Sequence, residues 1–155
     1  MKDNHALIVG SIGLDTIETA SDRKESILGG SATYATIAAG KSSSVHLVGI
    51  VGNDFPIEGI NIFKDTTFDL SNFEQKKGKT FSWGAKYADN WDNRDTLFTE
   101  LGVFNDFNPL LTHQNKEVPF IFLANIHPLL QLSVLNQCNK RKCVIIDTMN
   151  LWIDT

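Results

Sequence analysis

The sequence predicts an α/β fold in which a parallel sheet flanked by helices carries a small antiparallel β lid. Two observations favour this fold. Short apolar segments rich in β-branched residues alternate with helix-like stretches, as strands buried on both faces of a parallel sheet do. By contrast, residues 73–104 alternate apolar and polar positions, which is typical of antiparallel strands with one face in solvent. Together they predict one α/β domain over residues 1–155 with an inserted lid.

The composition limits the classes of partner. The chain has 155 residues, 42% of them hydrophobic and 21% charged, which suits one domain or part of one. Its net charge of -4 argues against a broad basic surface, so neither nucleic acid nor an anionic membrane is an expected partner. The N-terminus lacks a signal-peptide layout and no apolar run reaches membrane-spanning length, so a cytoplasmic location is expected. Cys138 and Cys143 predict neither a disulfide framework nor a metal site.

The first half of the chain predicts two strands of the main sheet and two helices that flank it. A strand over residues 6–12 leads into the polar segment 14–28, which is expected to form an exposed excursion of two short strands. Ser31 is expected to cap a helix that runs to about Lys41. A buried strand at 45–51 follows, and then a turn and a short helix around residues 57–63.

The second half predicts the lid and the return of the α/β pattern. Lid strands are expected within residues 14–28 and 73–104. Residues 119–124 predict a buried strand, and Pro128 fits the first turn of a helix that ends near Asn139. Residues 143–147 are apolar throughout, which predicts a central parallel strand.

Asp15 and the pair Gly29-Gly30 are the strongest candidates for ligand contacts. Asp15 ends the first strand segment, and the two glycines open the first helix. A carboxylate accepts hydrogen bonds from hydroxyls, and glycines let backbone amides come close, so the pair suits a polyhydroxy ligand. Taken alone, each also fits a structural role, as a turn aspartate and a tight turn.

Further polar and aromatic residues gather at predicted strand ends and on the lid. Ligands of open α/β sheets bind beyond the carboxyl ends of the strands, so polar groups there form a candidate pocket rim. The rim candidates are Asn125, His127, Asp147 and Asn150, whereas the segment Gly52-Asn53-Asp54 favours an Asx-type turn. Each of them alone also fits a structural role. The lid also carries four aromatic residues, Phe81, Trp83, Tyr87 and Trp91. Either all of them pack inside the lid, or one of their rings stacks on a sugar, and their spacing in the sequence does not distinguish these alternatives.

In order and spacing, these motifs resemble the N-terminal half of the ribokinase-like (PfkB-type) carbohydrate kinases. The resemblance lies in residues 9–15, 29–34, 47–55, 78–81, 122–128 and 144–150. It implies a Rossmann-like parallel sheet with a β lid that covers a sugar and forms a homodimer surface.

The resemblance also implies roles for individual residues. Asp15, Gly29 and Gly30 match the positions that hold sugar hydroxyls. The remaining expected substrate contacts are Tyr34, Asn53, Asn125 and Asn150, and the lid candidates are Thr80, Phe81, Trp83 and Tyr87. Tyr34 stands where many members carry an asparagine that touches the sugar, so the resemblance does not imply specificity for ribose.

The family's phosphoryl-transfer motifs have no counterpart in this sequence. A Gly-Ala-Gly-Asp motif with the catalytic base, the adenine pocket and an Asn-x-x-Glu motif linked to magnesium follow the matched region in the family. The chain is therefore expected to be the truncated, sugar-binding part of an ATP-dependent carbohydrate kinase. It is expected to contain no catalytic residue and to be inactive alone, with ATP and Mg bound by the complete enzyme. Two alternatives stay open: a nucleoside kinase of the same superfamily, and a short non-catalytic sugar-binding or interaction module.

Overall fold

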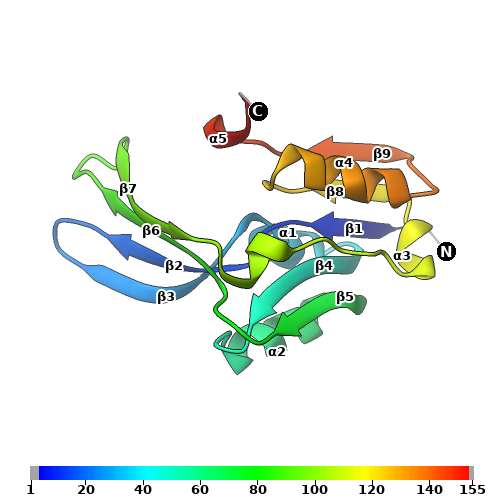
Figure 1. Ribbon diagram of the computed structural model, residues 1–155, viewed down its shortest axis with the longest axis horizontal. Coiled ribbons are helices and arrows are strands. Elements are labelled where there is room, and N and C mark those ends of the chain that lie inside the picture. The colour runs from blue at the N-terminus through cyan, green and yellow to red at the C-terminus, as the bar shows by residue number, and fades with distance from the viewer. Residues whose placement is uncertain (1–3, 154–155) are drawn as a thin grey trace.

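The computed structural model describes residues 4–153 and contains a five-stranded parallel sheet (Figure 1). Its strand order is β5-β4-β1-β8-β9, and each neighbouring pair is parallel. The strands are β1 (His5–Val9), β4 (Ser44–Gly52), β5 (Asp69–Lys76), β8 (Phe120–Leu123) and β9 (Cys143–Ile146). The chain builds outward from β1 through β4 to β5, and then continues on the other side with β8 and β9. The order therefore reverses between β1 and β8, which is where open α/β sheets bind ligands.

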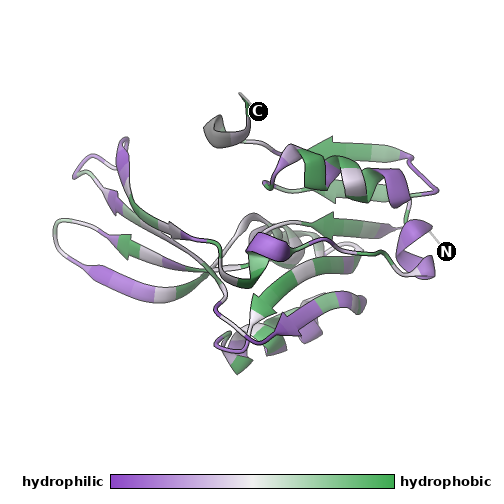
Figure 2. Cartoon of the chain, in the orientation of Figure 1, coloured by the Kyte–Doolittle hydropathy of each residue, from purple (hydrophilic) through white to green (hydrophobic). Residues whose placement is uncertain are grey.

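Helices cover both faces of this sheet, because its central strands β1, β4 and β8 are apolar on both sides. On one face α1 (Ser31–Ala39) and α2 (Ile57–Thr66) pack on a cluster that includes Ile8 and Leu47. On the other face α4 (Pro128–Gln137) and the segment around η1 (Gly102–Asp106) pack on a second cluster. The second cluster includes Leu7, Val9, Ile50, Ile121 and Leu123. Figure 2 shows the apolar colouring of β1, β4 and β8 that this double burial requires, and β9 is apolar as well.

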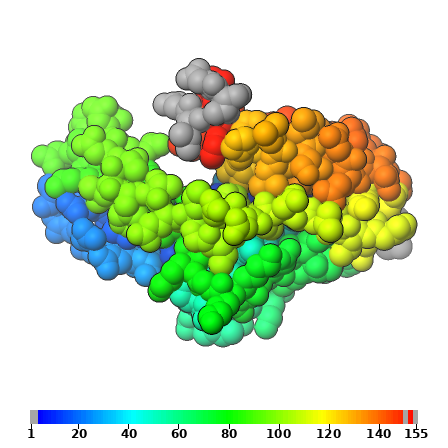
Figure 3. All heavy atoms as spheres, in the orientation of Figure 1, coloured from blue at the N-terminus to red at the C-terminus, as the bar shows by residue number. Residues whose placement is uncertain are grey.

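A second, smaller sheet extends beyond the carboxyl ends of the main strands. Its order is β3-β2-β6-β7, formed by β2 (Gly13–Glu18), β3 (Arg23–Gly29), β6 (Phe81–Tyr87) and β7 (Arg94–Glu100). The outer pairs are antiparallel, as predicted, but the central pair β2–β6 is parallel, so the sheet is mixed. Figure 3 shows this sheet as a lobe, with a hollow between it and the body that carries α4.

The expected elements are present, with shifted boundaries. Helix α1 ends at Ala39 rather than near Lys41, and α2 runs on to Thr66. The expected lid region 73–104 is too long at its start, because residues 73–76 belong to β5 and pair with β4 in the main sheet. The short helices α3 (His113–Lys116) and α5 (Asn150–Ile153) were not predicted. No helix among residues 4–153 is long and apolar enough to cross a membrane.

The strand predicted at residues 143–147 is present as β9, but its predicted burial is wrong. β9 forms an edge of the described sheet, and the side chains of Ile145 and Ile146 are 57% and 56% exposed. Apolar composition predicts that a segment becomes a strand. Burial also depends on a neighbour on each side, and within residues 4–153 β9 pairs only with β8.

A buried polar network ties together the amino ends of three main strands. His46 on β4 is 1% exposed, and its Nδ1 lies 2.6 Å from Oδ1 of Asn115. Asn115 Nδ2 donates to Asp69 at 3.0 Å and to Asn72 at 2.9 Å, both on β5. On the other side, His46 Nε2 lies 2.8 Å from Nδ1 of His5 on β1. Every polar atom named here has a partner within the protein, so this network is structural.

Candidate functional site

The amino end of α1 is fastened between β1 and β8 by a pair of serines. Ser11 follows β1, and its Oγ accepts a hydrogen bond from the backbone N–H of Ser31 at 3.2 Å. The two serine hydroxyls lie 3.1 Å apart, and the Ser31 hydroxyl also donates to the backbone carbonyl of Asn125, which follows β8. The helix terminus is therefore held at the position where the strand order of the main sheet reverses.

The predicted capping role of Ser31 is wrong in its detail. Gly30 is the N-cap residue of α1, and no side chain caps the helix. Ser31 is the first helical residue and uses its hydroxyl to join the two strand ends instead. The sequence analysis missed Ser11 altogether, although a hydroxyl directly beyond a buried strand is a signal that could have identified it.

Asp15 and Gly29 contact each other across the strand pair β2–β3. A Cβ atom on Gly29 would lie 2.0 Å from Oδ2 of Asp15, so only glycine leaves room for this carboxylate. Gly30 has a φ of +91°, and a Cβ there would lie 2.4 Å from the carbonyl oxygen of Ser11. The two glycines thus have separate tasks: Gly29 admits the carboxylate, and Gly30 admits the backbone of the strand end.

The Asp15 carboxylate has unused hydrogen-bonding capacity. Its Oδ1 is buried without a hydrogen-bond partner, and burial raises the pKa of Asp15 to about 6. Buried polar atoms in native proteins are almost always paired, so an unpaired carboxylate oxygen is the mark of a ligand site. Asn125 Oδ1, beyond β8, is buried and unpaired as well. Together they offer acceptors for the hydroxyl groups of a ligand. Thr36 Oγ1, inside α1, is also unpaired, but it lies away from the strand ends.

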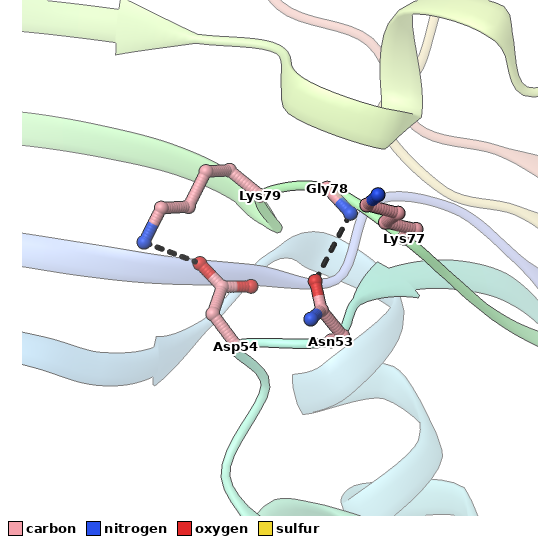
Figure 4. A pocket seen from close by; sticks show the side chains of 5 residues that line it. All are labelled: Asn53, Asp54, Lys77, Gly78 and Lys79. Atoms are coloured by element: carbon pink, nitrogen blue, oxygen red, sulfur yellow. Dashed lines mark hydrogen bonds and ion pairs between the residues drawn. The ribbon is translucent and has the colours of Figure 1, made fainter.

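Asn53 and Asp54 clamp the connection between the two sheets (Figure 4). Asn53 Oδ1 accepts a bond from the backbone N–H of Gly78 at 3.0 Å. Asp54 Oδ1 accepts bonds from both the backbone N–H and the hydroxyl of Thr80, at 2.8 and 2.7 Å. Although burial opposes the change, these bonds and the ammonium group of Lys79 lower the pKa of Asp54. Beside the clamp lies an open cavity of about 370 Å³. It is lined by Asn53, Asp54, Lys77, Gly78 and Lys79.

The other expected contacts take different positions. Tyr34, on α1, is 61% exposed, and its hydroxyl donates to the carbonyl of Leu28. His127 is the N-cap of α4, where its Nδ1 accepts from the backbone N–H of Leu129. Asp147 follows β9, and its backbone N–H donates to Leu123. Asn150 begins α5, and its side chain lies outside the described part of the structure. The binding roles expected of Tyr34, Asn53, Asn125 and Asn150 stay predictions.

Three of the four lid candidates lie on β6, and Thr80 directly precedes it. Thr80 is engaged in the clamp, where its hydroxyl also accepts from the backbone N–H of Gly52. Phe81 and Trp83 are half-buried, and the ring of Tyr87 lies 5.6 Å from that of Trp91 at the far end of the small sheet. The described side chains include no group of three or more His, Cys, Asp or Glu residues that could hold a metal ion.

Comparisons with known proteins identify the fold. No family model matches the sequence. A cytidine kinase of Thermococcus kodakarensis is 27% identical over 143 residues, which cover 91% of this chain and 50% of that kinase. A nucleoside kinase of Methanocaldococcus jannaschii, an archaeal member of the ribokinase family, superposes with a TM-score of 0.73 at 17% identity. It is matched over 93% of this chain and 52% of its own.

A ribokinase of Cryptococcus neoformans, solved in complex with ADP, gives a TM-score of 0.78 at 14% identity. The match covers 97% of this chain and 51% of that protein. The predicted fold class and the resemblance are therefore confirmed: the chain has the ribokinase-like fold. It spans about half the length of each protein that it matches here.

Proposed function

We propose that this chain is the acceptor-binding part of a ribokinase-family kinase, a phosphotransferase that acts on a sugar hydroxyl. The acceptor is a sugar, either free or as the ribose of a nucleoside. The observation that carries the proposal is the partly buried Asp15 carboxylate, whose Oδ1 has no partner and which lies beyond the switch point of the main sheet. The relatives are kinases of sugars and nucleosides by name, which supports the same reading.

In this proposal Asp15 accepts hydrogen bonds from acceptor hydroxyls and fixes the orientation of the sugar. Each bond to a charged acceptor contributes roughly 1.5–3 kcal/mol. Gly29 leaves room for the carboxylate, and the Ser11–Ser31 link holds the end of α1 against the site. Asn125, joined to Ser31 through its backbone carbonyl, supplies a second acceptor through its side chain.

ATP is the proposed phosphoryl donor of the whole kinase, because the matched ribokinase of Cryptococcus neoformans was solved with ADP. Phosphoryl transfer also needs a positioned base, a metal and amides around the transferring group. The family's motifs that carry the base and the metal have no counterpart in this sequence, so no transfer step is assigned to its residues. This chain is expected to bind the acceptor without phosphorylating it.

Calorimetric titration of the chain with ribose and with cytidine tests the proposal. Binding of either ligand by the wild-type chain, lost on Asp15→Asn and retained on Asp92→Asn, is the expected result. Asp92 is a matched control, since it is an exposed aspartate in the β6–β7 connection. Binding that survives Asp15→Asn would remove Asp15 from the site. A phosphorylated product formed from ATP by this chain alone would contradict the assignment of the transfer step to other residues.

A further inference from the structure

One row of side chains crosses the small sheet at the level of Asp15. Asp15 on β2 pairs with Ile27 on β3 and with Trp83 on β6, and Trp83 pairs in turn with Thr99 on β7. Directly opposed residues on neighbouring strands point to the same face, about 4.8 Å apart. Trp83 therefore lies beside Asp15, one strand away and on the same face.

The next row confirms which face this is. Gly13 pairs with Phe81 on one side and with Gly29 on the other. A Cβ on Gly13 would lie 2.8 Å from the ring of Phe81, and a Cβ on Gly29 would meet the carboxylate of Asp15. The side chains of Phe81, Asp15 and Trp83 thus share the face on which the two glycines leave space.

Only one aromatic side chain of β6 lies in the row of Asp15. Phe81 lies in the row of Gly13, and its ring packs 5.9 Å from that of Phe104, next to the body of the protein. Tyr87 is at the opposite end of β6, against Trp91. Of the aromatic side chains on β6, Trp83 is therefore the one directly opposite Asp15.

The indole of Trp83 is held in place by β7. The guanidinium of Arg94 lies over the ring, 5.6 Å from its centroid, and Nε1 donates to the hydroxyl of Thr96 at 3.4 Å. A ring fixed in this way is preorganised, so a ligand that stacks on it loses less free energy to ordering the side chain.

We propose that Trp83 determines the substrate class by stacking on the base of a nucleoside whose ribose hydroxyls bind Asp15. The inference rests on the proposed function, because it assumes that Asp15 holds sugar hydroxyls. A nucleoside carries a hydroxylated ring and a flat aromatic ring side by side, which matches a carboxylate and an indole one strand apart. A free sugar offers only the hydroxyls. Base–aromatic stacking tolerates different bases, so the preference is for nucleosides over sugars rather than for one base.

The test compares cytidine and ribose in calorimetric titrations of the full chain and four variants. Trp83→Leu keeps the apolar bulk and removes the aromatic ring, and Trp83→Phe keeps a smaller ring. Trp91→Leu is the control, since Trp91 is 64% exposed and lies beside Tyr87. Asp15→Asn reports separately on the hydroxyl-binding carboxylate.

We expect the wild-type chain to bind cytidine at least about tenfold more tightly than ribose. Trp83→Leu should remove most of that preference and leave ribose binding unchanged, Trp83→Phe should keep part of it, and Trp91→Leu all of it. Two results would overturn the role of Trp83: equal affinity of the wild-type chain for both ligands, or an unchanged preference for cytidine in Trp83→Leu. In either case the proposed function would stand as long as Asp15→Asn abolishes binding. Binding of neither ligand by the wild-type chain would overturn the proposed function and this inference with it.

Discussion

The two ends of the main sheet both hold buried polar side chains, but they are paired very differently. At the amino ends, His46 is bonded on both sides, to His5 and to Asn115, and the Asn115 amide donates to residues of β5. At the carboxyl ends, Asp15 and Asn125 each keep one buried oxygen without a partner. Burying an unpaired polar group costs free energy, so the unpaired end is less stable than it could be.

This difference separates a structural cluster from a candidate binding site. Because Asn115 Nδ2 donates, its Oδ1 must accept, and the network therefore assigns a proton to Nδ1 of neutral His46. His46 Nε2 then accepts from His5. The network is complete without a ligand, whereas the carboxyl-end cluster becomes complete only when donors reach Asp15 and Asn125. Sites that bind ligands commonly trade stability for such capacity.

The comparison is tested most strongly by removing the centre of the complete network. Asn115→Ala leaves His46, Asp69 and Asn72 without their shared partner, and each unpaired buried group costs about 1–3 kcal/mol. We expect the free energy of unfolding to fall by about 3 kcal/mol or more in urea titrations, with acceptor binding unchanged for the folded fraction. Asn105→Ala is the control, since Asn105 is exposed and its side chain donates to its exposed neighbour Asp106. A loss below about 1 kcal/mol would show that the network is not structural.

A double-mutant cycle tests the contact between Gly29 and Asp15. In the wild-type background Gly29→Ala places a methyl group against the carboxylate, and such overpacking costs roughly 1–3 kcal/mol. In the Asp15→Ala background the obstacle is gone, and the same change should cost much less. The measured quantity is the coupling free energy between the two positions from urea unfolding. Additive effects would contradict the contact between the two positions, since Gly29 is not among the glycines with a positive φ and the space it leaves is its expected role.

The sequence predicted β1, β4, β8 and β9 of the main sheet, because buried parallel strands appear as continuous apolar runs. It missed β5 as a strand of that sheet, because Asp69–Lys76 is mostly polar and shows no such run. It could not predict the parallel pairing of β2 with β6, since alternation of apolar and polar residues is the same in both directions. The sequence also predicted that Ile145 and Ile146 are buried, whereas both side chains are exposed. Their exposure depends on what lies beside β9, which composition does not report.

For the candidate site, the sequence identified Asp15, Gly29 and Gly30, and the structure brings these three together. The predicted place of Asp15 at the end of the first strand is wrong, because β1 ends at Val9 and Asp15 lies inside β2. The Ser31–Asn125 bond joins residues 94 positions apart, and the His46–Asn115 bond joins residues 69 positions apart. Pairs of this kind leave no periodic signal in one sequence. Which lid aromatic lies beside Asp15 is likewise a matter of register, which only the pairing of β2 and β6 decides.

The pH dependence of stability should have opposite signs at the two ends of the sheet. At the carboxyl end, the pKa of Asp15 is raised to about 6 from an ordinary value of 3.8. The folded state therefore binds the proton more tightly, and the contribution of Asp15 to stability declines as the pH rises from about 4 to about 6. Asp15→Asn, which carries no charge, should melt at a higher temperature than the wild-type chain at pH 8. The difference in melting temperature between the two proteins should disappear below pH 4. A lower melting temperature for Asp15→Asn than for the wild-type chain at pH 8 would contradict the predicted effect of the carboxylate.

At the amino end the smallest effect is expected, and it runs the other way. Burial lowers the pKa of His46 from an ordinary value of 6.5, although Asn115 and Asp69 oppose the change. The unfolded state then binds the proton more tightly, so the stability contributed by His46 is fully present above pH 6.5 and declines as the pH falls below it. The His46→Gln variant has no proton to gain in this range and should lose less stability than the wild-type chain between pH 7 and pH 5. Denaturant midpoints measured across this range in the Asp15→Asn background isolate the histidine from the carboxylate. A wild-type-like decline in the His46→Gln variant would contradict the assignment of the effect to His46.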